Sequence, residues 1–105
     1  MQDDTIEIMN MKRQKPVTPY DFVVDRSSKV GNPFILKTER DRAKVCEEYE
    51  KYFALNKGDP QFVKVLAAML AAHKKYGKLR LFCWCAPKRC HAETIKKHML
   101  GELFG

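Results

Sequence analysis

Residues 79–84 have the sequence Leu79-Arg80-Leu81-Phe82-Cys83-Trp84, the clearest strand pattern in the chain. Side chains alternate between the two faces of a strand, so the leucines and the cysteine would share one face, opposite Arg80, Phe82 and Trp84. An apolar pattern with helical spacing precedes this strand and ends at Gly77. Because a strand that returns after a helical crossover favours a parallel pair, the segment predicts an α/β fold.

The rest of the chain divides into segments with strand or helix patterns. Thr38 and Asp41 resemble a capping box at the start of one helix, and Asp59-Pro60 is a typical start for the next. The predicted elements are strands over 5–11, 20–24 and 79–84 and helices over 38–56, 60–76 and 92–103. We therefore expect a small single-domain α/β sandwich over residues 1–105, with residues 1–4 flexible. Its element order is β-β-α-α-β-α, with at least one parallel strand pair, and it is Rossmann-like in outline.

The composition indicates a folded domain with a basic C-terminal third. The chain has 105 residues, of which 45% are apolar, so disorder over most of its length is excluded. The net charge is +7, and residues 73–105 contribute +6 of it, from 8 basic and 2 acidic groups. We find no apolar run of the roughly 20 residues that a membrane-spanning helix needs, and the start of the chain does not resemble a signal peptide. We expect a cytoplasmic protein with reduced cysteines that attracts polyanions and has no membrane partner.

The first candidate site is the segment 83–91, which combines three cysteines with a histidine. Cys83 and Cys85 would point to the same side of an extended chain, and Cys90 and His91 would lie at the start of the last helix. Three sulfurs and one imidazole form a common ligand set for structural zinc, so Cys83, Cys85, Cys90 and His91 are candidate metal ligands. Their spacing is tighter than that of a standard zinc finger.

Other roles for the same residues remain open. Reduced cysteines are often simply small buried apolar groups. A thiolate at Cys85 or Cys90 is a second alternative, because a helix N-terminus lowers the pKa of a thiol. A disulfide is disfavoured in the cytosol.

The second candidate site is the loop 25–34, which leaves a strand and leads toward a helix. Arg26 could bind a phosphate or carboxylate with two hydrogen bonds, while Ser27, Ser28 and Asn32 add polar groups and Gly31 allows close approach of a ligand. The alternative is a plain turn in which serine and asparagine bond their own backbone and Asp25 pairs with Arg26.

The two candidate sites would meet if the strands over 20–24 and 79–84 were parallel neighbours. Their carboxyl ends would then surround one crevice, the usual ligand position in open α/β sheets. In such a crevice His91 could act as an acid or base, with Asp25 to orient it and Cys90 as a further catalytic group.

The same two segments resemble a known family. Asp25-Arg26-Ser27-Ser28-Lys29-Val30-Gly31-Asn32-Pro33-Phe34, followed by Leu81-Phe82-Cys83-Trp84-Cys85-Ala86-Pro87 and Cys90-His91, is similar to the domain of unknown function 4326, found in bacteria and phages. The resemblance covers most of residues 20–98. It implies an α/β domain with its site in these segments, but no established reaction. A phage-like origin would suit so short a basic protein. Ala92 departs from the glycine that often follows Cys-His in this family.

These observations lead to two hypotheses about function. In the first, the crevice binds an anionic ligand, with a nucleotide or nucleic acid as the leading candidate. A more specific form of this hypothesis is that the protein is an enzyme that acts on that ligand. In the second, the chain is a non-enzymatic adaptor, with or without zinc, whose basic surface docks on nucleic acid or on an acidic protein.

Overall fold

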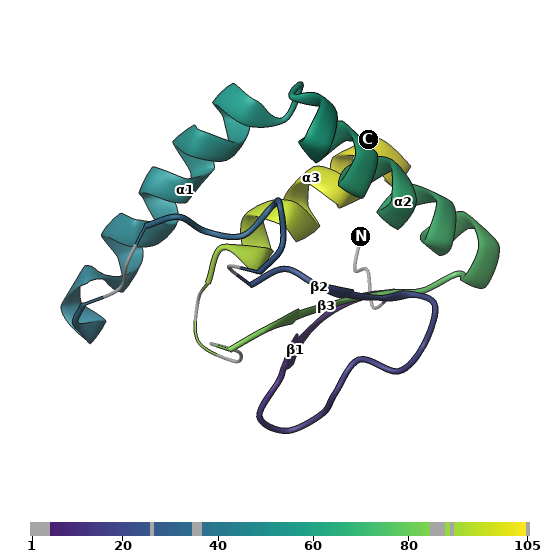
Figure 1. Ribbon diagram of the computed structural model, residues 1–105, viewed down its shortest axis with the longest axis horizontal. Helices are drawn as coiled ribbons and strands as arrows, with labels where there is room; N and C mark the ends of the chain where they lie inside the picture. Colours follow the sequence, from purple (N-terminus) through teal and green to yellow (C-terminus); the bar gives the residue numbers. More distant parts are fainter. Residues whose placement is uncertain (1–4, 26, 35–36, 85–87, 89, 105) are drawn as a thin grey trace.

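The computed structural model describes residues 5–25, 27–34, 37–84, 88 and 90–104 (Figure 1). The elements are β1 (Ile6–Asn10), β2 (Asp21–Val23), the 3-10 turn η1 (Glu39–Asp41), α1 (Arg42–Asn56), α2 (Pro60–Tyr76), β3 (Leu79–Cys83) and α3 (Ala92–Phe104). The predicted α/β class, the element order and the parallel pairing are confirmed. Within the described residues, none of the helices combines the length and the hydrophobicity needed to cross a bilayer.

The three strands form one parallel sheet in the order β1-β3-β2. The last strand in the sequence therefore occupies the centre, with Ile6 opposite Leu79 on one side and Asp21 opposite Arg80 on the other. A central strand is covered on both faces, which requires a nearly continuous apolar run. β3 meets this requirement, because Leu79, Leu81 and Phe82 are completely buried.

The two crossover connections lie on opposite faces of the sheet. The chain moves from β1 to β2 in one direction across the sheet and from β2 back to β3 in the other, so right-handed crossovers must use different faces. Figure 1 shows the three helices on one side and the segment 11–20, which connects β1 to β2, on the other. The carboxyl ends of all three strands point to the same edge.

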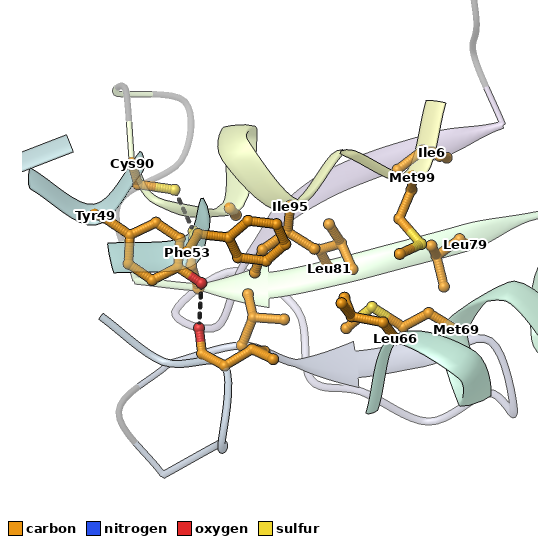
Figure 2. Packing of buried hydrophobic residues seen from close by; sticks show 14 of the residues in the cluster. Ile6, Tyr49, Phe53, Leu66, Met69, Leu79, Leu81, Cys90, Ile95 and Met99 are labelled. Carbon is orange, nitrogen blue, oxygen red and sulfur yellow. Dashed lines mark hydrogen bonds between the residues drawn. The ribbon is translucent and has the colours of Figure 1, made fainter. Parts of the chain in front are cut away.

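The main core lies between the sheet and the helices. Leu79, Leu81 and Cys83 contribute from β3, while Tyr49 and Phe53, Leu66 and Met69, and Ile95 and Met99 contribute from α1, α2 and α3. Figure 2 shows this cluster extending from Tyr49 and Cys90 at one end to Met69 and Met99 at the other. The helices are fixed mainly by this burial, as is usual in small domains.

The face of the sheet away from the helices has a polar centre. Arg80 donates two hydrogen bonds to Asp21, from Nε to Oδ1 at 2.6 Å and from Nη2 to Oδ2 at 2.8 Å. Asp21 Oδ2 also accepts hydrogen bonds from the backbone N–H groups of Val17 and Thr18 at 2.9 Å. Asp21 therefore ties the 11–20 segment to the sheet, and the guanidinium of Arg80 lies over the buried ring of Phe82.

One predicted helix start is confirmed and the other is corrected. The Asp59 side chain accepts a hydrogen bond from the N–H of Gln61, with Pro60 in the first turn, as expected for an N-cap. Thr38, however, precedes the 3-10 turn, and its hydroxyl donates to Asp41 at 3.1 Å and caps no backbone N–H. The α-helix itself begins only at Arg42.

Candidate functional site at the carboxyl edge of the sheet

The two segments identified from the sequence meet at the carboxyl edge of the sheet. β2 and β3 are parallel neighbours, and beyond β2 the N–H of Val24 still bonds the carbonyl of Phe82 at 2.9 Å. The indole Nε1 of Trp84 donates to Asp25 Oδ2 at 2.9 Å, joining the two loops where they leave the sheet. The condition under which the two segments would meet, that β2 and β3 are parallel neighbours, is therefore fulfilled.

The end of β1 reaches the same place. The N–H of Met11 donates to the carbonyl of Cys83 at 2.8 Å, and Asn10 Nδ2 donates to the carbonyl of Trp84 at 3.4 Å. Residues after all three strands therefore lie together. We call Asn10, Lys12, Arg13, Asp25, Ser27, Lys29 and Trp84 the strand-tip site.

Asp25 is held by both of its carboxylate oxygens. Oδ1 accepts from the backbone N–H of Ser27 at 2.9 Å and from its hydroxyl at 2.5 Å, and Oδ2 accepts from Trp84. Burial by itself would raise the pKa of Asp25, but these hydrogen bonds and the nearby His91 together lower it. The carboxylate is therefore charged at neutral pH, and it serves to orient the indole ring.

The other polar side chains of the loop also bond within it. Ser28 Oγ accepts from the N–H of Val30 at 3.2 Å, and Asn32 Oδ1 accepts from the N–H of Phe34 at 2.9 Å. These contacts match the plain-turn interpretation for Ser28 and Asn32. Gly31 donates its N–H to the carbonyl of Ser28 at 3.0 Å. Arg26, the predicted phosphate ligand, lies outside the described residues.

His91 lies beneath this loop and contacts its backbone. The side chain is nearly buried, and Nε2 bonds the carbonyl of Val24. The imidazole also packs edge-on against the ring of Tyr49, with the centroids 5.1 Å apart. His91 thus fixes the start of the loop, while its acid–base role stays a prediction.

Tyr49 fixes the other end of the same loop. Its hydroxyl donates to the carbonyl of Val30 at 2.5 Å, and burial raises its pKa, which keeps the hydroxyl protonated. His91 and Tyr49 therefore hold the loop at two carbonyls six residues apart, Val24 and Val30. This arrangement positions the loop without using a group that faces solvent.

Replacing Tyr49 by phenylalanine is expected to lower the free energy of unfolding by about 1 to 3 kcal/mol, because the buried carbonyl of Val30 loses its donor. Urea denaturation of the variant and of the natural chain measures this difference. Tyr52→Phe is the matched control, since Tyr52 is a half-buried aromatic neighbour and should change stability less. Equal effects of the two substitutions would contradict the importance of the Tyr49 hydroxyl.

The cysteines are placed only in part. Cys83 Sγ and Cys90 Sγ are 3.3 Å apart in the buried core, and Cys85 lies outside the described residues. In the part of the chain that is described, no group of three or more histidine, cysteine or acidic side chains could hold a metal ion. Because His91 Nε2 bonds Val24, zinc would have to bind the other ring nitrogen, and the predicted zinc site stays a prediction.

Comparison with known families identifies the domain. A family model described as a domain of unknown function, DUF4326, matches residues 9–101. The chain belongs to this family. Searches of curated proteins and of solved structures found no match. The strand-tip site of this DUF4326 domain lies within the matched residues.

Exposed basic side chains lie in the segments that follow the three strands of the DUF4326 domain. Lys12 and Arg13 follow β1, in a turn where the N–H of Arg13 donates to the carbonyl of Asn10 at 3.0 Å. Lys29 lies in the loop after β2 and Lys88 in the segment after β3, where it forms an ion pair with Glu39 at 3.4 Å. Each of the three segments that follow the strands therefore carries at least one exposed basic side chain.

Trp84, a member of the strand-tip site, and Tyr49, which holds the loop 25–34 in place, are absent from the candidate site residues named on sequence alone. Trp84 is the sole tryptophan of the chain and is half exposed, although it directly follows a buried strand. Its position before Cys85-Ala86-Pro87 is the signal that could have pointed to it. Tyr49 appears in the sequence only as an apolar position of a helix, because its hydrogen bond to Val30 depends on tertiary structure.

Proposed function

We propose that this DUF4326 domain binds a nucleotide or a nucleic acid strand at the strand-tip site, with a base stacked on Trp84. The observation that carries the proposal is the half-exposed indole ring at the end of the central strand, held in place by its hydrogen bond to Asp25. An aromatic side chain fixed in this way loses little conformational freedom on binding. Base–aromatic stacking is the usual device of proteins that bind unpaired bases.

The topology of the sheet supports the same location. The connection after β1 passes over one face of the sheet, and the connection after β3 leads to α3 on the other (Figure 1). β1 and β3 are neighbours in the sheet, and the connections that follow them leave toward opposite faces. In open α/β sheets a crevice opens at the carboxyl edge between two such strands, and ligands bind there. Asn10 and Trp84 border this point, since the side chain of one bonds the carbonyl of the other.

The charge of the surroundings suits a phosphate-containing ligand. Lys12, Arg13 and Lys29 are exposed and lie in loops that begin at the strand ends. Positive charge of this kind contributes most of the affinity of proteins for nucleic acid backbones, independently of sequence. The negative charge of Asp25 is compensated by the three hydrogen bonds that it accepts.

The test uses the natural fluorescence of Trp84, which is the sole tryptophan of the chain. Titration with a single-stranded oligoadenylate or with adenosine triphosphate should quench its emission, because a stacked base contacts the indole. Inorganic triphosphate is the control, since it supplies charge without a base and should cause little quenching. Equal quenching by all three ligands would contradict stacking and would show that the ligands bind by electrostatic attraction alone.

The salt dependence of binding should decrease when the basic residues after β1 are removed. For single strands, the logarithm of affinity falls by about 0.7 per phosphate contact against the logarithm of salt concentration. Replacing Lys12 and Arg13 together by alanine should therefore reduce the slope by roughly 1.4, as anisotropy titrations of a labelled oligoadenylate at several salt concentrations would measure.

The control replaces Lys51 and Lys64, which are exposed on α1 and α2, by alanine. This pair removes the same charge from the molecule but leaves the strand-tip site intact. A slope that falls equally in both double variants would show that the ligand responds to net charge and would reject this site.

A further inference from the structure

Cys83 and Cys90 form a close pair of thiols that the proposed nucleotide site does not use. Cys83 ends β3, Cys90 precedes α3, and both side chains are buried. Their sulfurs are 3.3 Å apart, whereas a disulfide requires about 2.0 Å. A movement of little more than 1 Å would therefore join them, and both residues are in the thiol state.

A pocket is lined in part by one member of the pair, Cys90. Its volume is about 150 Å³, and it is lined by Cys46, Glu50, Cys90, Glu93, Thr94 and Lys97. Of these residues, the two cysteines are buried, whereas Glu50, Glu93 and Lys97 are exposed. A water molecule occupies about 30 Å³ in the liquid, so the pocket can admit an oxidant as small as hydrogen peroxide.

We propose that Cys83 and Cys90 are a redox couple that hydrogen peroxide oxidises to a reversible disulfide, with Cys90 attacked first and Cys83 as the resolving thiol. The assignment of the order rests on access, because Cys90 lines the pocket while Cys83 lies at the end of the central strand, 1% exposed. The observations behind this couple are separate from those behind the proposed nucleotide binding, so neither proposal rests on the other.

The chemistry balances in two steps. The Cys90 sulfur attacks one oxygen of hydrogen peroxide, the O–O bond breaks, and a sulfenic acid and one water form. The Cys83 sulfur then attacks the Cys90 sulfur, an S–S bond forms, the S–O bond breaks, and the hydroxyl leaves as water with the proton of Cys83. Two thiols and one peroxide thus give one disulfide and two waters, and a small-molecule dithiol reverses the reaction.

A disulfide between these residues is compatible with a reducing compartment. Disulfides of cytosolic proteins are mostly transient and redox-sensing. The bond would close the segment 83–90 into a ring that contains Trp84, so oxidation would constrain the loop that carries the indole.

The experiment maps the bond in the natural chain. The reduced protein is treated with equimolar hydrogen peroxide, blocked with N-ethylmaleimide and digested with trypsin. Cleavage after Arg80, Lys88, Arg89 and Lys96 places Cys83 and Cys90 in separate peptides, 81–88 and 90–96. We expect the two peptides to be linked, with a mass two hydrogens below the sum of their separate masses. Fragmentation should place the bond at Cys83 and not at Cys85, and dithiothreitol should separate the peptides. A bond from Cys90 to Cys46 or Cys85, or thiols that remain fully reactive toward N-ethylmaleimide, would overturn the proposal.

Two variants separate the roles of the cysteines. Cys46→Ser should leave the yield of the linked peptides unchanged, although Cys46 lines the same pocket. Cys83→Ala should abolish the link and leave a sulfenic acid at Cys90 that dimedone traps. If dimedone were found on Cys46 and not on Cys90, Cys46 would be the thiol that peroxide oxidises first, and the proposed order would be overturned. If Cys83→Ala does not fold, the mapping of the natural chain decides the proposal alone.

Discussion

Replacing Asp21 by alanine is expected to lower the free energy of unfolding by about 3 kcal/mol. The Asp21 side chain is fully buried and pairs with Arg80 through two hydrogen bonds. Removing one partner of a buried ion pair typically costs about 3 to 5 kcal/mol, because the other charge is left uncompensated. We expect the lower end of that range, since the Arg80 side chain is 12% exposed and can reach some water.

Asp21→Ala should also make the free energy of unfolding less dependent on pH in the acidic range. Burial by itself would raise the pKa of Asp21, but the hydrogen bonds from Arg80 and from the N–H groups of Thr18 and Val17 lower it far below the ordinary value. A carboxyl with a lowered pKa in the folded state stabilises the fold fully above its unfolded pKa, which is about 4, and loses this effect as the pH falls toward the folded pKa. The natural chain should therefore lose stability between about pH 5 and pH 2 more steeply than Asp21→Ala.

Urea denaturation at neutral pH and at about pH 3 measures both effects. Glu39→Ala provides the matched control, because Glu39 also accepts two hydrogen bonds from an arginine, Arg42, each at 2.8 Å. The Glu39 side chain is 63% exposed, so water can replace its partner and the loss should be small at neutral pH. Comparable losses in the two variants would show that burial of the Asp21–Arg80 pair does not matter.

The contrast between these two ion pairs illustrates what the sequence can and cannot predict about the fold. The strand 79–83 and the helix start at Asp59-Pro60 depend on local patterns, and the sequence predicts both. The pairing of Asp21 with Arg80 joins residues far apart in the chain, and no local pattern marks it. The strand order β1-β3-β2 is likewise set by tertiary packing, because β3 is apolar enough for the centre of the sheet.

The candidate site shows the same division. From the sequence, the segments 25–34 and 83–91 would meet only if the strands before them were parallel neighbours; the structure shows that they are, and Trp84 bonds Asp25. Residue types alone could not separate the groups that face solvent from those that hold the loop. His91 is a candidate catalytic group on sequence alone, yet in the fold it is buried and bonds Val24, whereas Trp84 is not among the sequence candidates and is half exposed.

This exposure leads to the second large effect. Replacing Trp84 by alanine is expected to weaken the binding of a labelled single-stranded oligoadenylate by about 5- to 150-fold, since one base–aromatic stack contributes about 1 to 3 kcal/mol. Anisotropy titration measures this loss without using the tryptophan as the probe. The variant should fold normally, because half of the Trp84 surface is already in contact with water.

Two further variants distinguish stacking from other contributions of the ring. Trp84→Phe keeps an aromatic face but loses the hydrogen bond to Asp25, so it should bind more tightly than Trp84→Ala and less tightly than the natural chain. Tyr76→Ala removes a ring of similar exposure from the end of α2, beside Tyr20 near the amino ends of the strands, and should leave affinity unchanged. A Trp84→Ala variant that binds as well as the natural chain would reject the stacking contact. A loss caused equally by Tyr76→Ala would instead indicate binding spread over the surface, because a single stacked base can contact only one of these rings.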